Sequence, residues 1–387
     1  MITIDYLGLA EPELVAAGAI HTAREIAQQP RLLRRTHELV AGLHADIRAF
    51  AGDLLDNPAA RVILTGAGSS AYIGQCLASW LDRRLAARVD AVPTTDIVSA
   101  PRLQLDPEQP LLLVSFARSG NSPESLATVE LAEALVRDVR HLMIVCNADG
   151  ALCQLSLARS MTLLLPPETH DAGFAMTSSF SCMLYAALAA LSPAGAMDTR
   201  ADRIADATGQ AILDALPALQ ALASEPFERI VYLGSGVLQG LAREAALKLG
   251  ELTNGAVATC FESPLGFRHG PKTFVTENTL VLVFVSNDPL TRRYDLDLID
   301  ELRRDNRAAQ IVEISARPRV LADTADGIAL ADMAEAADVD LCWPYLAIAQ
   351  IHALLRSLAL GLTPDNPNPA GLVNRVVQGV RLYGLKP

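Results

Sequence analysis

The sequence of 387 residues lacks the common marks of a membrane or secreted protein. No uninterrupted apolar run is long enough to span a bilayer. The first residues, MITIDYLGLAEPE, lack the basic-then-apolar order of a signal peptide. The six cysteines are scattered and form no CxxC pair, which predicts reduced thiols rather than disulfides. We therefore expect a cytoplasmic protein with no membrane partner.

Metal ligands and a basic surface are also missing from the pattern. The seven histidines show no HExxH or similar ligand spacing, so the sequence predicts no metal site. A net charge of −12 argues against a nucleic-acid partner bound by a generic basic surface. It still allows one small anionic ligand in a local positive pocket.

The length favours two domains, and the pattern favours α/β structure. Short apolar strands alternate with helical segments, which predicts a doubly wound parallel sheet. The strands expected in the first half are residues 62–64, 89–92, 111–115, 141–146 and 161–165. Apolar spacing predicts helices at residues 22–27, 32–55, 177–191 and 343–360.

The most informative stretch is residues 111–126, LLLVSFARSGNSPESL. An apolar strand leads into a Ser/Gly loop, and Pro123 suits the first turn of a following helix. Free N–H groups at such a helix start favour an anion. The alternative is that Ser and Gly only form a turn and a helix cap. The loop residues that would serve an anion are Arg118, Ser119, Gly120, Asn121 and Ser122.

A second strand–turn–helix lies at residues 61–74, RVILTGAGSSAYIG. Its turn contains Gly66 and Gly68 and leads into Ser69 and Ser70. The third glycine of a dinucleotide fingerprint is missing, because that position is Ala71. We therefore do not expect a dinucleotide.

The second half of the chain repeats the first. Residues 229–236 match 61–68 at an offset of 168, and 280–286 match 111–117 at an offset of 169. Residues 310–314 match 141–145, also at 169, which indicates a duplicated domain. The Ser/Gly loop is not repeated, since Ser-Asn-Asp-Pro at 286–289 carries an acid instead. We expect the first half to bind the anion and the second half to supply other chemistry.

Two segments of the second half carry candidate chemistry. The helix at residues 240–252 places Glu244, Lys248 and Glu251 on one face, although such spacing is also ordinary helix stabilisation. Residues 261–272 read as a long connection, and they hold His269 between Gly and Pro residues. A histidine fixed in this way is a candidate acid/base, although a loop histidine can equally be incidental.

The C-terminal tail, TPDNPNPAGLVNRVVQGV, is rich in Pro and Asn and then apolar. Val373, Val376, Val377 and Val380 suggest that it packs. It could be a lid with Asn374, Arg375 or Gln378 facing inward, or a plain C-terminal brace.

Taken together, several motifs resemble the sugar isomerase (SIS) domain family. They are SFARSGNSPES, GFAMTSSF, PLGFRHGP, SNDP-TRRYDLDL and LGLTPDNP…VNRVVQGV, over about residues 30–385. Within the family they resemble the AgaS group, the galactosamine-6-phosphate deaminase/isomerases, also named tagatose-6-phosphate ketose/aldose isomerases. The resemblance implies two tandem SIS domains, each a flavodoxin-like parallel sheet with helices on both faces. The implied division is a helical segment at 1–50, a phosphate-binding domain at 51–205, a catalytic domain at 206–364 and a tail over the active site at 365–387.

A more distant resemblance, to the isomerase half of glucosamine-6-phosphate synthase, implies roles for single residues. Ser70, Ser119 and Ser122 would hold the phosphate, beside Ser69, and Thr177 would contact sugar hydroxyls. Glu251 would be the general base, Lys248 a helix lysine of the site, and His269 the ring-opening group from a neighbouring subunit. Two positions depart from that relative: Ala117 replaces a loop serine, so that Arg118 or a main-chain donor would compensate, and Gln378 or Arg375 replaces a C-terminal lysine.

The resemblance implies a deaminating isomerase that converts galactosamine 6-phosphate to tagatose 6-phosphate and ammonia, in amino-sugar catabolism. No glutaminase domain precedes the SIS halves, so we do not expect the amination direction. No cofactor is required, and shared sites imply a homodimer or a dimer of dimers. The alternatives are an aldose–ketose isomerase of a neutral sugar phosphate, a glucosamine-6-phosphate deaminase and a non-catalytic sugar-phosphate sensor.

Overall fold

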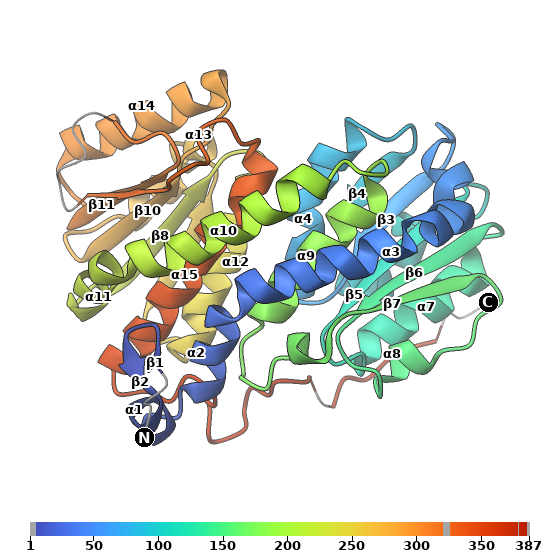
Figure 1. Ribbon diagram of the computed structural model, residues 1–387, viewed down its shortest axis with the longest axis horizontal. Coiled ribbons are helices and arrows are strands. Elements are labelled where there is room, and N and C mark those ends of the chain that lie inside the picture. The colour runs from blue at the N-terminus through green and yellow to red at the C-terminus, as the bar shows by residue number, and fades with distance from the viewer. Residues whose placement is uncertain (1–4, 320–325, 378, 385–387) are drawn as a thin grey trace. The chain divides into compact units, whose positions relative to one another are not determined.

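A computed structural model describes residues 5–319, 326–377 and 379–384 of the chain (Figure 1). The described residues divide into two compact units that interleave along the sequence. Unit 1 takes the residues up to Arg31, then Asp171–Thr177 and Asp198–Pro369, and unit 2 takes Leu32–His170, Ser178–Met197 and the residues from Ala370 on. The expected segments 1–50, 51–205, 206–364 and 365–387 are consecutive, and their boundaries stay a prediction.

Unit 2 is built on a parallel five-stranded sheet in the order β4-β3-β5-β6-β7. The strands are β3 (Arg61–Thr65), β4 (Arg88–Ala91), β5 (Leu111–Ala117), β6 (Val139–Val145) and β7 (Ser160–Leu164). The helices are α3 (Gln29–Leu55), α4 (Ser69–Asp82), α5 (Thr94–Ser99), α6 (Pro101–Gln104), α7 (Pro123–Leu135), α8 (Ala151–Gln154), η1 (Pro167–Thr169) and α9 (Ser178–Leu191).

Unit 1 is built on a second parallel sheet, in the order β12-β11-β10-β8-β9. The strands are β8 (Arg229–Gly234), β9 (Ala258–Glu262), β10 (Thr279–Phe284), β11 (Gln310–Ser315) and β12 (Gly327–Ala329), and β1 (Asp5–Tyr6) pairs antiparallel with β2 (Leu9–Ala10). The helices are α1 (Glu11–Ala16), α2 (Ile20–Ala27), α10 (Asp198–Asp214), α11 (Leu216–Ser224), α12 (Val237–Leu252), α13 (Pro264–Phe267), η2 (Pro271–Phe274), α14 (Pro289–Asp305) and α15 (Asp338–Ala359).

The two large sheets have the same strand order, which numbered along each repeat is 2-1-3-4-5. This is the flavodoxin-like arrangement, so the predicted fold class is confirmed. The offset of 169 for the second strand pair is wrong by one residue. Leu113 faces α7 in one unit and Val281 faces α14 in the other, which requires an offset of 168. A shift of one residue would turn every side chain of the strand to the opposite face.

The cores follow from these strands, because both faces of each sheet are covered. In β5 the residues Leu111–Ala117 are all buried, as expected for a strand with helices on both sides. Alternate residues such as Leu111 and Leu113 pack against α5 and α7. In unit 1 the strand residues Val281 and Val283 pack against Leu298 and Ile299 of α14.

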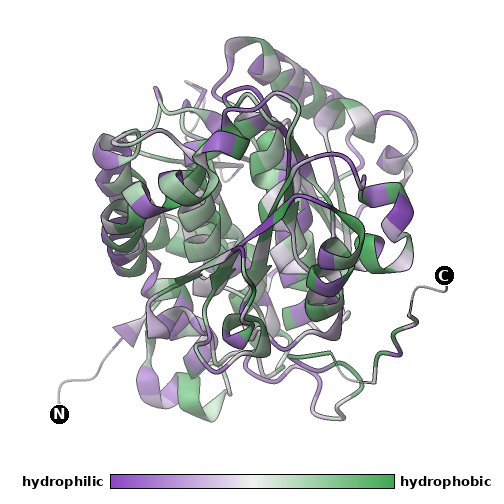
Figure 2. Ribbon diagram, turned by 90° about the vertical axis from the view of Figure 1, so that its right-hand side faces the viewer, coloured by the Kyte–Doolittle hydropathy of each residue, from purple (hydrophilic) through white to green (hydrophobic). Residues whose placement is uncertain are grey.

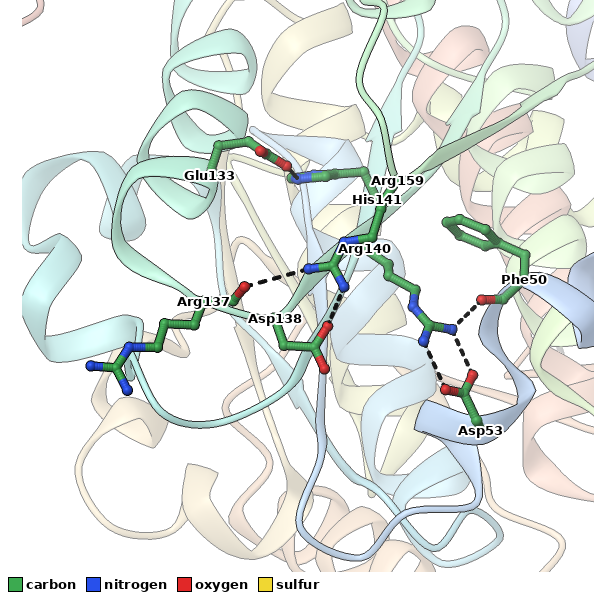
Figure 3. Close-up of polar contacts among 8 residues, drawn as sticks. All are labelled: Phe50, Asp53, Glu133, Arg137, Asp138, Arg140, His141 and Arg159. Carbon is green, nitrogen blue, oxygen red and sulfur yellow. Dashed lines mark hydrogen bonds and ion pairs between the residues drawn. The ribbon is translucent and has the colours of Figure 1, made fainter.

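The start of β6 is fixed by polar contacts (Figure 3). Arg140 donates two hydrogen bonds to the Asp53 carboxylate of α3, at 2.6 and 2.7 Å, and one to the Phe50 carbonyl oxygen. Next to it, the fully buried His141 bonds through Nε2 to Glu133 of α7 at 2.8 Å. Strand β6 is thereby tied to a helix on each side, at the end remote from the loops that follow the strands.

Other expectations meet the structure with mixed results. Residues 261–272 are not one long loop, because they contain the end of β9, helix α13 and the start of η2. No described helix is long and apolar enough to cross a membrane. The terminal segment carries hydrophobic stretches (Figure 2), but Val373 and Val377 are 57% and 54% exposed, so the prediction that they pack is wrong.

Candidate active site

In unit 2, two loops meet at the carboxyl edge of the sheet. Strands β3 and β5 are neighbours in register, with Thr65 opposite Ser115, so the loops that follow them lie at the same edge. This is the switch point of a 2-1-3-4-5 sheet, where ligands of open α/β folds bind. The structure therefore brings Ser69 and Ser70, at the start of α4, to the same edge as residues 118–122.

The first of these loops requires glycine for steric reasons. A Cβ atom on Gly66 would lie 2.5 Å from Cβ of Ser70, and Gly68 has a φ of +57°. The close approach lets α4 begin directly after the turn, with both serines almost buried. Their main-chain N–H groups belong to the first turn of a 14-residue helix, which is the favourable end for an anion.

The loop at residues 118–122 is held from beneath by the segment that follows β6. Asn147 donates through Nδ2 to the Ser119 carbonyl oxygen at 2.9 Å, and the N–H of Ala151 donates to Asn121 Oδ1 at 2.9 Å. Gly120 has a φ of +71°, and a Cβ atom there would lie 3.1 Å from Cα of Gly150. The loop is thus tightly fixed, as a preformed anion site requires.

Ser122 and Arg118 of this loop also have specific partners. The Ser122 hydroxyl donates to Glu124 Oε2 at 2.7 Å, just before α7 begins. The buried Arg118 donates from Nη2 to the carbonyl oxygen of Arg375 at 2.9 Å, and thereby fixes the terminal segment of unit 2. Gln378 lies outside the described residues.

In unit 1, helix α12 places Lys248 between two carboxylates. Its Nζ bonds to Glu251 Oε2 and lies 3.6 Å from Glu244 Oε1. Lys248 and Glu244 have no exposed side-chain area, whereas the Glu251 side chain is 26% exposed. This arrangement differs from an ordinary ion pair on a helix surface, because the ammonium is buried. It gives the partly exposed Glu251 carboxylate a neighbour in a fixed position.

His269 is exposed at the end of a short folded segment. Ser263 caps α13 by accepting a hydrogen bond from the N–H of Gly266 at 3.1 Å, and the buried Phe267 anchors the helix. Gln239 of α12 bonds Glu262 at 2.8 Å, which connects the helix of Lys248 to this segment. His269 is therefore an exposed residue that follows a helix held in place by its cap and by Phe267.

The residues on either side of His269 are clamped to helix α14. Arg268 bonds Glu301 at 2.7 Å and Asp297 at 2.7 Å, and Lys272 contacts Glu301 and Asp305. The three acids follow one another at four-residue spacing, so they lie on one face of α14. We call Asp297, Glu301 and Asp305 the acidic ladder. The sequence analysis did not identify it, and the four-residue spacing of the three acids was the available signal.

Thr177 lies in unit 1 and is buried at the end of the segment Asp171–Thr177. Its N–H donates to Asp171 Oδ2 at 2.8 Å, and Glu25 of α2 accepts from the N–H groups of Ala172 and Gly173 at 2.6 and 3.1 Å. Burial, followed by the negative charge of Asp171, raises the pKa of Glu25 to about 8.

Neither Glu25 nor Asp171 was expected from the sequence. Glu25 shares the buried face of α2 with Thr22 and Ile26, so an acid on an otherwise buried stripe was the available signal. The structure places Thr177, Lys248, Glu251 and His269 in unit 1, and Ser69, Ser70 and residues 118–122 in unit 2. Among the described residues, no group of His, Cys, Asp or Glu is arranged to hold a metal ion.

Comparison with known proteins agrees with this architecture. The family model of the SIS domain matches residues 57–193, which contain the sheet of unit 2. Together with the duplicated sheet, this match defines a protein of the SIS-domain class.

Full-length relatives narrow the class. D-galactosamine-6-phosphate deaminase AgaS of Escherichia coli is 46% identical over 372 residues, which cover 95% of this chain and 97% of that protein. The protein of the same name from Shewanella sp. (strain ANA-3) is 45% identical over 383 residues, covering 97% of this chain and 95% of the relative. The crystal structure of tagatose-6-phosphate ketose/aldose isomerase from Escherichia coli matches with a TM-score of 0.87 and 42% identity, over 95% of this chain and 97% of that one. The chain therefore belongs to the AgaS group of the SIS-domain family.

Proposed function

We propose that this protein converts galactosamine 6-phosphate and water to tagatose 6-phosphate and ammonia. The observation that supports it most is the near-complete alignment, at 46% identity, with the Escherichia coli enzyme named D-galactosamine-6-phosphate deaminase. The buried ammonium of Lys248 beside the partly exposed Glu251 agrees with it, because proton transfer at carbon needs a carboxylate that is both fixed and accessible.

The chemistry can be assigned to residues of this chain. His269 opens the sugar ring by moving a proton between O1 and O5. Glu251 then moves a proton from C2 to C1, while Lys248 steadies the charge that develops on the enolamine. The resulting imine at C2 takes up water, and its carbon–nitrogen bond breaks to give the ketose phosphate and ammonia. Each well-placed acid or base of this kind contributes about 10²–10⁴-fold in rate.

The phosphate of the substrate is assigned to unit 2. The N–H of Ser69, the hydroxyls of Ser69 and Ser70 at the start of α4, and the loop at residues 118–122 supply donors at the switch point of the sheet. Thr177 is assigned to the sugar hydroxyls, and Gln378, which lies outside the described residues, is assigned to substrate binding in place of the relative's C-terminal lysine. Phosphate binding in this scheme positions the substrate and takes no part in the chemistry.

The assembly we propose is a homodimer or a dimer of dimers with shared active sites. The exposure of His269 on a rigidly held segment supports this, because such a side chain can act outside its own fold. A cytoplasmic location, a mechanism that requires no cofactor and the lack of nucleic-acid or membrane partners belong to the same proposal.

One alternative activity has a specific observation in its favour. The Escherichia coli structure at 42% identity bears the name of a ketose/aldose isomerase, so a neutral sugar phosphate is the second candidate substrate. The same Glu251 and His269 would serve that reaction, and no ammonia would be released. The third candidate is a glucosamine-6-phosphate deaminase, whose substrate differs from galactosamine 6-phosphate only in the configuration at one carbon.

Parallel assays of ammonia and ketose on the purified protein test the proposal. Galactosamine 6-phosphate should yield ammonia and ketose in equal amounts, and glucosamine 6-phosphate should be converted at a lower rate. Conversion of tagatose 6-phosphate to an aldose in the absence of ammonia would favour the isomerase. Binding of the sugar phosphates with no turnover of any would instead support the non-catalytic sensor.

A further inference from the structure

The duplicated fold gives unit 1 a second switch point, at the ends of β8 and β10. Gly234 and Gly236 repeat the turn of unit 2: a Cβ atom on Gly234 would lie 2.4 Å from the Leu238 carbonyl oxygen, and Gly236 has a φ of +58°. Long helices, α12 and α14, start after both strands here as well. The loop after β10 is residues 285–288, one residue shorter than the loop at 118–122 that follows β5.

The donors of this second switch point are taken up by two carboxylates of the chain itself. The N–H of Ser286 donates to Asp295 Oδ2 at 2.9 Å, and the Ser235 hydroxyl donates to Asp295 Oδ1 at 2.6 Å. The Ser286 hydroxyl donates to Asp338 Oδ2 at 2.5 Å, and the N–H of Asn287 donates to Asp338 Oδ1 at 2.7 Å. Two main-chain N–H groups and two serine hydroxyls thus converge on four carboxylate oxygens.

These donors are the kind that would otherwise hold a tetrahedral oxyanion. Asp295 and Ser286 are fully buried, so water does not replace the carboxylates there. Burial raises the pKa of Asp295 to about 6, against the lowering effect of its hydrogen bonds, and leaves the group mainly ionised at neutral pH. Arg292 on the same helix is a further electrostatic partner of Asp295.

Unit 2 has no acid at the corresponding helix positions. Asp295 is the seventh residue of α14 and Asp338 is the first of α15. The seventh residue of α7 is Val129, and the first residue of α9 is Ser178. The two repeats therefore differ at the two positions that supply the carboxylates.

We infer that Asp295 and Asp338 are built-in occupants of a second oxyanion cradle, which the duplication created in unit 1 and which these carboxylates keep closed to phosphate. The chain then has one phosphate site, in unit 2, because unit 1 carries its own anions in that place. Removal of the Asp338 carboxylate should leave a small site for a free oxyanion such as formate. The inference rests on the contacts within unit 1 and does not depend on the proposed reaction.

Chemical rescue by formate tests the inference. In Asp338→Ala the two donors to the carboxylate, the Ser286 hydroxyl and the N–H of Asn287, lose their acceptor, and space opens beside them. The Tm of this variant should therefore be about 2–4 °C higher in sodium formate than in sodium chloride of equal ionic strength. In Asp338→Asn the amide keeps the space filled, and formate should have no more effect than in the wild type. Unit 2 is the same in all three proteins, so any response of its own loop cancels in the comparison.

A second variant covers the case in which Asp338→Ala does not fold. Asp338→Ser retains a short hydroxyl that suits a helix start and still leaves space for formate. A formate-dependent rise in the Tm of either small variant, absent from Asp338→Asn, supports the cradle. Equal responses in the small variant, Asp338→Asn and the wild type would overturn it, whatever the outcome of the substrate assays.

Discussion

Lys248 directs its Nζ to Oε2 of Glu251, on a helix where the lysine is fully buried and the glutamate is partly exposed. A second carboxylate, Glu244, lies 3.6 Å from the same nitrogen and is buried with it. The ammonium therefore holds one carboxylate in place at the surface and neutralises another inside. This division separates the catalytic role proposed for Glu251 from a structural role for the buried Glu244, and the two roles can be tested independently.

Replacement of Glu251 by glutamine should lower kcat for deamination by about 10²–10⁴-fold, because the amide cannot move a proton between C2 and C1. Binding of the sugar phosphate should stay near that of the wild type, as measured by calorimetry. Glu277→Gln is the matched control, since Glu277 is an exposed acid of the same unit. Full activity of Glu251→Gln would remove the residue from the mechanism.

Lys248→Met should destabilise the protein by about 3–5 kcal/mol, because it leaves Glu244 as a buried carboxylate without its ammonium. The double variant Glu244→Gln/Lys248→Met should recover most of this loss, since both charges are then absent. Urea unfolding measures the effect, and both variants should have reduced turnover. A single variant as stable as the wild type would show that the buried pair contributes nothing.

Glu301→Ala should reduce kcat several-fold with little change in KM, because it removes the acid shared by Arg268 and Lys272 on either side of His269. Hydrogen exchange of residues 264–274 should increase at the same time. The conservative variant Glu301→Asp should restore part of the rate. Glu108→Ala serves as control, since it breaks an ion pair with Arg137 in which both side chains are more than half exposed. Unaltered exchange in Glu301→Ala would contradict a positioning role for the acidic ladder.

Gly120→Ala should weaken phosphate binding, because its φ of +71° is unfavourable for alanine and the new Cβ would approach Cα of Gly150 to 3.1 Å. The backbone strain alone costs roughly 1–2 kcal/mol. Gly361→Ala is a matched control with a φ of +72° and no atom within 4 Å of the new Cβ. Gly361→Ala should show the loss of stability that the backbone strain alone causes, Gly120→Ala should lose more because its new Cβ also meets Gly150, and only Gly120→Ala should show a raised KM. An equal KM in the two variants would separate the loop from substrate binding.

The free energy of unfolding should fall as the pH rises from about 4.5 to about 8, as a result of Glu25. Burial raises the pKa of this carboxyl above its usual value of 4.5, so within that window the folded state holds a proton that the unfolded state has lost. Glu25→Gln should remove this contribution and be more stable than the wild type at pH 8. Urea midpoints between pH 5 and pH 9 measure the difference. Parallel pH profiles of the two proteins would mean that Glu25 is ionised throughout.

Much of the fold could be predicted because local patterns carried it. These patterns act within a few residues of their own position. They are the apolar run 111–114, the glycines of residues 66–68, and Pro123 and Pro289 at the starts of two helices. The internal repeat was visible for the same reason, although the true offset of the second strand pair required the pairing of β10 with its neighbours. Both strands are apolar runs, so their sequences look alike at an offset of 168 or 169. Only the offset of 168 places equivalent side chains on the same face of the two sheets.

The sequence by itself determined the two parallel sheets, the loop at residues 118–122 and the face shared by Glu244, Lys248 and Glu251. Only the tertiary structure decided that Lys248 is buried and that the acidic ladder bonds Arg268 and Lys272, on either side of His269. It also decided that Asp295 and Asp338 accept the hydrogen bonds at the second switch point. The physical reason is the distance along the chain over which each interaction acts. Strand, turn and helix preferences arise from neighbours along the chain, whereas burial of a charge and the choice of its partner depend on residues tens of positions away that only the packed fold brings into contact.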